Sequence, residues 1–403
     1  MAQDPVARAL ASLDERALVA ALVDLVRVPS VFDPAAGTTE EPAARFAHDL
    51  LAGWGWAPLW EEVAPGRPNV VATLRGARPG PHLILEGHTD VVTPGDPAAW
   101  SHDPFGGEIM GGRLYGRGAA DMKGGVIAAL FAAEAVRASG VPFAGTLTLA
   151  IVADEEGMMA GIKDFVARGH ADDATAALVC EPEGGRVCVA QKGALRVRVS
   201  ARGVMAHGAM PESGANPVAA LAEFLSRVHA LERDLQDEAG EHEYLGKVYL
   251  TPTVIGGGEV AQLNVIPASA VAYLDVRTTP LAPHEALLDR LRQVALGVAQ
   301  DGDGCTLAVD VLEDRPPTMT DPDGPLVAAV VAAHEAVHGA PPPLGGVPGA
   351  TDGTILWRER GLPVVVYGPG DVTIPHQADE FVRLADVTAA ARVYVRAILG
   401  YLA

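Results

Sequence analysis

An apolar run that ends in three consecutive carboxylates is the feature that most constrains this chain. Leu147-Thr-Leu-Ala-Ile-Val152 is almost entirely apolar, and Asp154, Glu155 and Glu156 follow it before Gly157. The run predicts a strand that is buried on both faces of a sheet. Adjacent carboxylates resist ionising together, and a divalent cation would relieve their repulsion at the end of the strand, where open α/β sheets bind ligands. Taken alone, the stretch is explained equally well as a solvated acidic turn.

A second predicted strand, His82–Asp90, also ends in candidate metal ligands. Strand geometry would point His88 and Asp90 to the same side, and histidine is the commonest metal ligand in proteins. Asp90 is placed to orient the imidazole, because a ligating histidine usually donates its second ring N–H to a carboxylate or carbonyl. A lone histidine at a strand end is more often structural, so this segment also needs support from others.

Two further apolar segments supply that support. Ala176–Cys180 leads directly into Glu181, and Leu362–Tyr367 leads through a glycine-rich turn to His376. Each segment has a simple structural explanation, but four strands that all lead into His or Glu do not. Together they predict a metal site at the carboxyl edge of a sheet.

The segment Gly116-Arg-Gly-Ala-Ala-Asp121 begins like a dinucleotide-binding loop, but Asp121 replaces the third glycine of that motif. A carboxylate at this position would repel a pyrophosphate, which excludes the nucleotide interpretation. Asp121 instead precedes an apolar helix predicted over 126–137, whose N-terminal N–H groups favour an ionised carboxylate. This placement suits a carboxylate that is shared by two cations.

His334-Glu-Ala-Val-His338 offers a competing metal site, because it matches the HExxH zinc motif. It lies in a helix predicted to begin near Pro325 and to end at Gly339. Both histidines therefore fall in the last turn, where the helix dipole favours a cationic imidazole. No third ligand follows at the metzincin spacing, but a mononuclear site here stays open as an alternative.

Length and composition exclude several classes of function. A chain of 403 residues is long enough for two domains, and its formal net charge of −21 argues against nucleic acid or an anionic membrane as the main partner. No apolar run is long enough to span a membrane, and the N-terminus lacks a secretory signal. Three cysteines without a metal-binding spacing indicate free thiols. We therefore expect a cytoplasmic protein.

The order of predicted elements indicates an inserted domain. Residues 5–28 predict one amphipathic helix, and residues 69–74 a strand. From about residue 191 to 312 the pattern changes to half-exposed strands and two helices, which predicts a small α+β domain. The first of these helices is expected to start at Pro217, after the capping residue Asn216. The remaining residues, 1–190 and 313–403, predict an α/β domain with a mostly parallel sheet and helices on both faces.

Taken together, the motifs resemble the M20 family of metallopeptidases and deacylases, which includes acetylornithine deacetylases, succinyl-diaminopimelate desuccinylases, aminoacylases and glutamate-releasing carboxypeptidases. The resemblance covers most of the chain in the family's order. Its motifs are Gly87-His-Thr-Asp90, Gly116-Arg-Gly-Ala-Ala-Asp121, Asp154-Glu-Glu-Gly157, Glu181-Pro-Glu183, Ala206-His-Gly-Ala-Met-Pro-Glu212 and His376-Gln-Ala-Asp379.

The resemblance implies two zinc ions per chain, which cobalt or manganese can replace. It implies that one ion is held by His88 and Glu181, the other by Glu156 and His376, and both by a bridging Asp121. It also implies that Asp90 orients His88 and that the peptide bond between Asp121 and Met122 is cis.

The resemblance further implies the roles of residues around the metals. Glu155 is expected to act as general base towards a metal-bridged hydroxide, and His207 to stabilise the oxyanion. Asn264 and Arg277 match positions that hold a substrate carboxylate, which suits the fork of an arginine. Gly345–Gly353 resembles a glycine-rich substrate loop and includes Gly349 and Thr351, although relatives more often have Ser before the Asp.

We therefore expect a metal-dependent amidohydrolase that removes the acyl group from an N-acyl amino acid or a similar small carboxylate-bearing amide. The inserted domain is expected to be a lid that also forms a homodimer. A carboxypeptidase or dipeptidase of the same family is the alternative within this class. A non-catalytic binding or scaffold relative is the alternative from another class.

Overall fold

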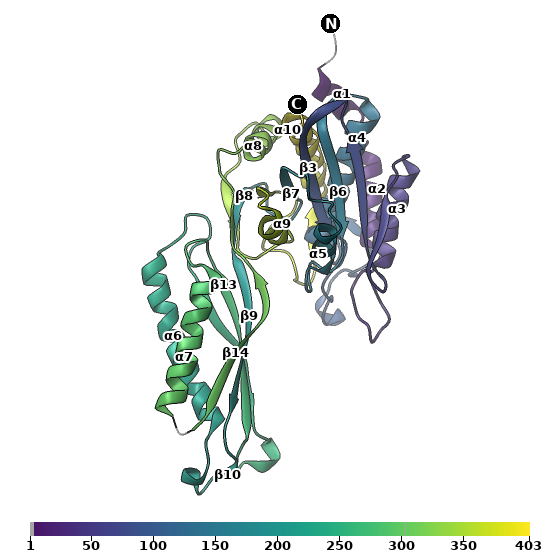
Figure 1. The fold of residues 1–403 in the computed structure, drawn as a ribbon. Helices are drawn as coiled ribbons and strands as arrows, with labels where there is room; N and C mark the ends of the chain where they lie inside the picture. Colours follow the sequence, from purple (N-terminus) through teal and green to yellow (C-terminus); the bar gives the residue numbers. More distant parts are fainter. Residues whose placement is uncertain (1–3, 303) are drawn as a thin grey trace. The chain divides into compact units, whose positions relative to one another are not determined.

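The computed structural model describes residues 4–302 and 304–403, which form two compact units (Figure 1). The first unit contains the chain up to Val189 together with Met319–Gly346 and Thr351–Ala403. The second contains Ala190–Thr318 and Val347–Ala350. The second unit is therefore an insertion, and the backbone N–H of Thr320, just after it, donates a 2.7 Å hydrogen bond to the carbonyl of Val189, just before it.

A nine-stranded sheet forms the centre of the first unit, in the order β1-β2-β6-β3-β7-β17-β8-β15, with β16 paired to β8. The central strands β6, β3, β7 and β17 are parallel, whereas β1, β2 and β8 pair with their neighbours in antiparallel fashion. The carboxyl ends of the central strands therefore lie at one edge of the sheet. The bounds are β1 Leu59–Ala64, β2 Arg67–Arg75, β3 Arg78–His88, β6 Ala144–Val152, β7 Ala176–Val179, β8 Val187–Gln191, β15 Thr318–Met319, β16 Leu344–Val347 and β17 Val364–Val366.

Helices cover both faces of this sheet, which confirms the predicted α/β class (Figure 1). On one face α4 and α10 pack against β3, together with α1, α2, α3 and α8. On the other face α5 packs against β2 and β6, α9 packs against β7 and β17, and the two helices contact each other. The bounds are α1 Pro5–Ala11, α2 Glu15–Val26, α3 Glu41–Gly53, α4 Gly124–Ser139, α5 Ala160–Ala167, α8 Pro325–His338, α9 Gly353–Arg360 and α10 Leu384–Tyr401. A small sheet, β18-β5-β4, adds Phe381–Arg383, Arg113–Tyr115 and Glu108–Met110.

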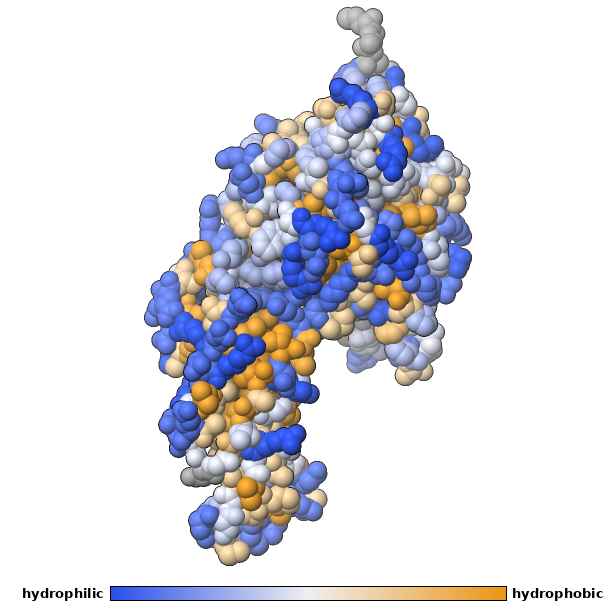
Figure 2. Space-filling view, viewed as in Figure 1, coloured by the Kyte–Doolittle hydropathy of each residue, from blue (hydrophilic) through white to orange (hydrophobic). Residues whose placement is uncertain are grey.

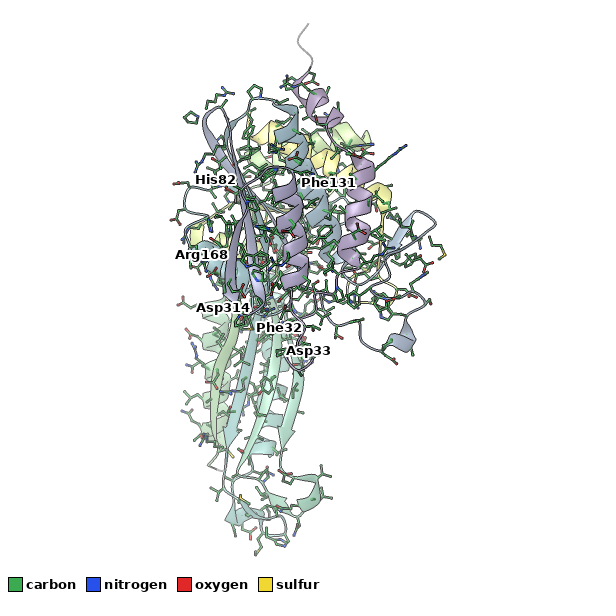
Figure 3. The ribbon with its side chains drawn as sticks, turned by 90° about the vertical axis from the view of Figure 1, so that its right-hand side faces the viewer. Phe32, Asp33, His82, Phe131, Arg168 and Asp314 are labelled. Atoms are coloured by element: carbon green, nitrogen blue, oxygen red, sulfur yellow. The ribbon has the colours of Figure 1, made fainter. Side chains whose placement is uncertain are left out.

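Helix α4 is buried almost all round, because it lies between the sheet and the other helices. Figure 3 shows Phe131 of α4 among these helices, and the indole of Trp54 meets its ring edge-on at 4.9 Å. Close approach to the sheet requires a glycine at the start of the helix. A Cβ added to Gly125 would lie 1.9 Å from the carbonyl oxygen of Cys180, at the end of β7.

The single helix predicted over residues 5–28 is wrong, because the chain forms two helices there. Helix α1 ends at Ala11, and α2 begins at Glu15 after Asp14. The Asp14 carboxylate accepts hydrogen bonds from the N–H groups of Arg16, at 3.1 Å, and Ala17, at 3.0 Å. An aspartate with this geometry starts a new helix, and the apolar periodicity on either side conceals the break.

The second unit is an antiparallel sheet, β11-β13-β9-β14, with helices α6 and α7 packed on it. Strand β9 alternates between buried apolar and exposed charged residues, as expected when one face packs on helices and the other meets water. The bounds are β9 Gly193–Arg202, β11 Tyr249–Gly257, β13 Ser269–Thr278, β14 Thr306–Arg315, α6 Pro217–Ala239 and α7 His284–Asp301. The predicted start of α6 is confirmed, because Asn216 caps it and Pro217 is its first residue.

Figure 2 shows apolar side chains at the surface of the second unit as well as the first. The exposed apolar residues of the second unit include Val254 and Ile255, which are 52% and 56% exposed on the edge strand β11. A separate two-stranded sheet pairs β10, Ala206–His207, with β12, Val265–Ile266. Within the described ranges, none of the helices combines the length and apolarity needed to cross a membrane.

Candidate metal centre

His88 is the last residue of β3 and is buried. Its Nδ1 lies 2.9 Å from the backbone carbonyl of Asp90, which can only accept, so Nδ1 carries the proton. Its Nε2 faces two carboxylates, with Oδ1 of Asp121 at 3.2 Å and Oε1 of Glu181 at 3.4 Å. Burial alone would lower the pKa of His88, but contacts with Asp121, Asp90 and Glu181 outweigh it and raise that pKa well above its usual value. The carboxylates around His88 therefore favour a positive charge at this position, supplied either by a proton or by a metal ion.

The Asp90 carboxylate faces His88 and also has partners that the sequence does not predict. Its Oδ1 lies 3.5 Å from His88 Nδ1, farther than the backbone carbonyl. The two carboxylate oxygens also accept the backbone N–H groups of Glu155, at 3.2 Å, and Glu156, at 3.0 Å. Burial would raise the pKa of Asp90, but His88 and these N–H donors lower it. Asp90 thus fixes the turn that carries both glutamates.

Asp121 reaches two imidazoles with different oxygens. It lies in a turn between Gly118 and α4, and its peptide bond to Met122 is cis, as the family resemblance implies. Oδ1 lies 3.2 Å from Nε2 of His88, and Oδ2 lies 3.3 Å from Nε2 of His376. Burial would raise the pKa of Asp121, but the two histidines hold it well below its usual range.

Glu156 and His376 form the other side of the cluster. The turn after β6 carries Glu156, and the long loop after β17 carries His376, whose backbone is left-handed. Oε1 of Glu156 lies 2.7 Å from Nε2 of His376. The contacts with Asp121 and Glu156 raise the pKa of His376 to about 10.

These five side chains form two overlapping groups with the geometry of metal ligands. One group is His88, Asp121 and Glu181, the other is Asp121, Glu156 and His376, and within each group the ligand atoms lie within 4.8 Å of one another. Imidazole nitrogen and carboxylate oxygen are ligands that zinc, cobalt and manganese accept. Burial and the nearby Asp121 raise the pKa of Glu181 to about 8, which shows how much negative charge is concentrated here. The donor set therefore fits divalent cations.

Glu155 is buried beside this cluster but belongs to neither group of ligands. Burial is the main cause that raises its pKa well above the usual range, and the charges of Glu181, Asp352 and Glu156 add to that rise. A carboxylate in such surroundings is a candidate for proton transfer.

Asp154, the first of the three consecutive carboxylates, is neutralised by the protein itself. Its Oδ1 lies 2.7 Å from Nη2 of Arg67 on β2, and its Oδ2 accepts the N–H groups of Met158 and Ala160. Arg67 also pairs with the buried Glu40. The argument from charge crowding therefore applies to Glu155 and Glu156 only. Nothing in the local sequence around Arg67 indicates this partner, because the contact is tertiary.

The predicted substrate residues lie in different parts of the chain. In the second unit, β10 pairs with β12, so His207 is opposite Val265, and Gly208 donates a 2.7 Å hydrogen bond to the carbonyl of Asn264. Arg277 on β13 already forms a fork to Asp275, with Nε–Oδ1 of 2.7 Å and Nη2–Oδ2 of 3.0 Å.

The two residues predicted from the glycine-rich loop have different surroundings. Gly349 belongs to the second unit, and a Cβ added to it would meet nothing within 4 Å. Thr351 belongs to the first unit and is buried, and its Oγ1 accepts the N–H of Gly353 at the start of α9.

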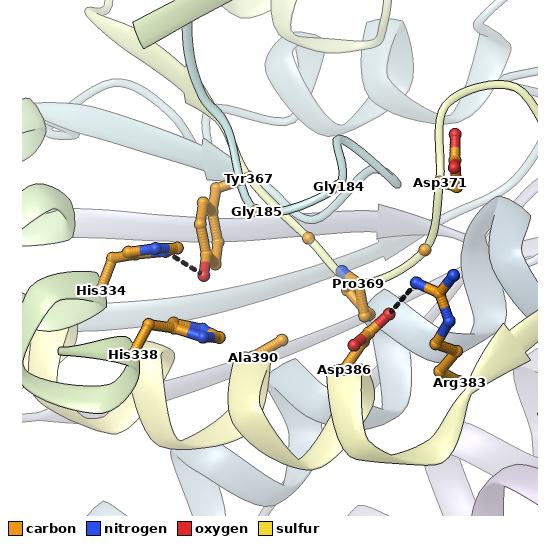
Figure 4. Close-up of a pocket in the computed structure, with 12 residues that line it drawn as sticks. Gly184, Gly185, His334, His338, Tyr367, Pro369, Asp371, Arg383, Asp386 and Ala390 are labelled. Carbon is orange, nitrogen blue, oxygen red and sulfur yellow. Dashed lines mark hydrogen bonds and ion pairs between the residues drawn. The ribbon is translucent and has the colours of Figure 1, made fainter. Parts of the chain in front are cut away.

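The HExxH histidines do not form a metal site of the expected kind. They line a pocket of about 250 Å³ together with Tyr367, Arg383 and Asp386 (Figure 4). The rings of His334 and His338 stack at 4.1 Å with 25° between their planes, and Nδ1 of His334 bonds the Tyr367 hydroxyl at 2.9 Å. Burial and the neighbouring His338 lower the pKa of His334 to about 4. Among the residues that the structure describes, neither histidine joins a group of three potential ligands.

Comparison with known proteins identifies the class to which this fold and site belong. Residues 84–400 match the model of peptidase family M20/M25/M40. The succinyl-diaminopimelate desuccinylase of Rhodospirillum centenum is 34% identical over 384 residues, which cover 92% of this chain and 94% of that enzyme. The chain belongs to the M20 family and is a metal-dependent hydrolase.

Solved structures share the fold at low sequence identity. The dipeptidase Dug1p from Saccharomyces cerevisiae superposes with a TM-score of 0.77 at 16% identity, covering 98% of each chain. The Bacillus subtilis YXEP protein, described as a dinuclear metal-binding peptidase, gives a TM-score of 0.73 at 18% identity and covers 96% of this chain and 98% of that one.

Proposed function

We propose that this protein is a dinuclear metal hydrolase that cleaves the amide bond of an N-acyl amino acid or a related carboxylate-bearing amide. One observation carries the proposal: Asp121 belongs to both groups of ligands and faces a different imidazole with each oxygen. A carboxylate in this position suits two cations that share it. The similarity to a desuccinylase over nearly the whole chain supports removal of an acyl group as the reaction.

In this proposal His88 and Glu181 would hold one ion, Glu156 and His376 would hold the other, and Asp121 would be shared by both. The nitrogen and oxygen donors suit Zn²⁺, and Co²⁺ or Mn²⁺ would be accepted by the same set. Two bound divalent ions supply a water of lowered pKa and polarise the scissile carbonyl. The chain itself fixes the ligands: Nδ1 of His88 is held by the Asp90 carbonyl, and the turn of Glu156 is held by the Asp90 carboxylate.

Glu155 is the proposed general base. It accepts one proton from the attacking water and then donates that proton to the nitrogen of the departing amine. Its buried position favours this exchange, because burial raises the pKa of a carboxyl group and so makes it a stronger proton acceptor. The hydrogen bond from its backbone N–H to Asp90 fixes the position of Glu155 in the turn. Its side chain belongs to neither group of proposed ligands.

The second unit is the proposed lid and dimerisation domain. In this role His207 would stabilise the oxyanion, and Asn264, Arg277 and Gly349 would contact the substrate together with Thr351 of the first unit. The pairing of β10 with β12 supports a joint role for His207 and Asn264. The fork of Arg277 is occupied by Asp275, so a substrate carboxylate would exchange with that carboxylate for the same guanidinium. The exposed edge strand β11 is where a second copy would pair.

The experiment that tests the function begins with protein stripped by a chelator. Zinc or cobalt is titrated back while bound metal is counted, and N-succinyl, N-acetyl and dipeptide substrates are assayed under Co²⁺. We expect two ions per chain, recovery of N-acyl hydrolysis, and a Glu155→Gln variant that binds both ions without turnover. Full turnover by Glu155→Gln would overturn the general-base assignment.

The same experiment separates the alternatives. Preference for dipeptides would place the protein among the peptidases of the family, and absence of bound metal would favour a scaffold. A mononuclear site on α8 predicts that His334→Ala and His338→Ala abolish metal binding while His88→Ala spares it. We expect the opposite result, because the two α8 rings stack and do not converge on a common point.

A further inference from the structure

A buried ion pair lies directly behind the shared ligand Asp121. Glu380 is 0% exposed and Arg117 is 2% exposed, and Oε2 of Glu380 pairs with Nη1 of Arg117. Oε1 of Glu380 accepts the backbone N–H groups of Ala120, at 3.0 Å, and Asp121, at 3.1 Å. One carboxylate therefore holds the main chain at the residue whose side chain belongs to both ligand groups.

Stability alone does not account for this arrangement. Removing two charges from water is costly, and apolar residues of similar size often replace a buried ion pair without loss of stability. Arg117 places a positive charge against the carboxylate that accepts two backbone N–H groups of the ligand-bearing turn.

The same carboxylate connects Asp121 to the segment that carries His376. Glu380 follows His376 by four residues, and its carbonyl accepts the N–H of Gly116 at 2.9 Å. The next residue, Phe381, pairs with Tyr115 as β18 meets β5. Just before these anchors, Oδ1 of Asp379 accepts the N–H groups of Ser101 and His102 at 2.7 and 3.2 Å. The loop that bears His376 is therefore attached to the segment that bears Asp121.

The two groups of ligands differ in how much they depend on this attachment. His88 ends β3, and Glu181 lies two residues beyond the end of β7, so the central sheet fixes both. His376 lies in a long irregular loop, ten residues beyond the end of β17, and its side chain is 52% exposed. Glu380 therefore supports two of the three ligands in the group of Asp121, Glu156 and His376, but only Asp121 in the other group.

We propose that Arg117 and Glu380 are positioning residues that set the separation between Asp121 and His376 and thereby hold the metal ion on the His376 side. This inference rests on the proposed dinuclear function. It predicts an unequal effect. Loss of the pair lowers the affinity for the ion on the His376 side and leaves the affinity for the ion of His88 and Glu181 nearly unchanged.

The test uses the full-length apoprotein and the variants Glu380→Gln and Arg117→Met. Glutamine keeps one acceptor oxygen but removes the charge that pairs with Arg117. Calorimetric titration with Zn²⁺ and the absorption spectrum of bound Co²⁺ report the two ions separately from activity. We expect the first ion to bind within about threefold of the wild type and the second to bind about 10–100-fold more weakly, as is typical when a residue that supports a metal ligand is lost. Excess Co²⁺ should restore kcat, with KM little changed.

Two further variants separate positioning from general stability. Glu313→Gln alters another buried carboxylate, one that faces Arg315 at 3.5 Å in the second unit, and both ions should bind it as they bind the wild type. Arg117→Lys keeps the charge, and it should recover much of the second ion's affinity even if Arg117→Met fails to fold.

The possible outcomes are distinguishable. If the wild type binds two ions and Glu380→Gln binds both as tightly, or loses affinity for both equally, the positioning role is overturned and the proposed function stands. A lowered Tm with unchanged affinity for the second ion has the same meaning. If the wild type binds only one ion, the dinuclear function itself fails, and the inference fails with it.

Discussion

The backbone N–H of Glu155 donates a 3.2 Å hydrogen bond to Oδ1 of Asp90, and the next N–H, from Glu156, donates to Oδ2 at 3.0 Å. The strand that ends in His88 thus holds the turn that follows β6, through a side chain two residues beyond its own end. A proposed metal ligand and the proposed general base are held by the same carboxylate.

Replacing Asp90 tests this relationship. In Asp90→Asn one of the two acceptors becomes an NH₂ group that faces a backbone donor. We expect kcat to fall about 10–100-fold with both metal ions retained, because the turn shifts while the ligands remain. Steady-state kinetics with metal analysis measures this. Asp96→Asn, in an exposed loop where Asp96 accepts the N–H of Ala98, is the control and should leave kcat unchanged. Equal kcat for Asp90→Asn and the wild type would contradict the assignment.

The pairing of Arg67 with Asp154 and Glu40 predicts a large effect on stability. In Arg67→Met two buried carboxylates lose their cation, and breaking a buried pair in this way costs about 3–5 kcal/mol. Burial already raises the pKa of Glu40, and loss of Arg67 would raise it further. A raised carboxyl pKa means that the folded state binds more protons, so the loss of stability should grow as the pH rises above about 4.5.

Urea unfolding of the apoprotein at several pH values measures the effect of Arg67→Met. Arg168→Met is the comparison, because Arg168 pairs with Asp164 at the surface and its loss should matter much less. A similar, small effect for both variants would show that the buried network contributes little.

His334 predicts a stability change at mildly acidic pH. Its pKa in the folded protein is about 4, below the value of about 6.5 in an unfolded chain. Below pH 6.5 the unfolded chain therefore takes up a proton that the folded chain does not, and stability is lost as the pH falls towards 4. We expect His334→Gln to remove about 1–3 kcal/mol of this loss. Unfolding free energies of both apoproteins from pH 7 to pH 4 provide the test, and parallel curves would contradict it.

Two glycines in helices predict opposite responses to alanine. At Gly125 a Cβ would lie 1.9 Å from the carbonyl of Cys180, so Gly125→Ala must push α4 away from β7 and should cost about 3 kcal/mol or more. At Gly53, the last residue of α3, a Cβ meets nothing within 4 Å, so alanine should be neutral or stabilise by up to about 1 kcal/mol. Thermal unfolding compares the two, and equal Tm values would show that α4 adjusts without cost.

The sequence was sufficient to predict the sheet that positions the metal centre. Buried strands are apolar along their whole length, and parallel strands end at a common edge, so a histidine or glutamate after several such runs indicates convergence. The partner of Asp154, which lies beside these ligands without being one of them, is not predictable in the same way. The contact between Arg67 and Asp154 joins residues far apart in the chain, and no local pattern marks it.

Other differences have local causes. The break between α1 and α2 depends on the cap at Asp14, which an apolar periodicity does not reveal. The carbonyl of Asp90 lies closer to Nδ1 of His88 than its carboxylate does, because the strand ends at His88 and the chain turns there.

The hydrogen bond between Thr320 and Val189 marks the place where the segment Ala190–Thr318 could be removed from the first unit. Because the chain leaves the first unit and returns to it at neighbouring points, a short glycine-serine bridge would span the gap at little cost in loop-closure entropy. The five proposed metal ligands all belong to the unit that would remain. Such a shortened chain would show whether the proposed metal ligands assemble without the inserted segment. The same junction would allow the inserted segments of relatives to be exchanged in order to alter substrate selectivity.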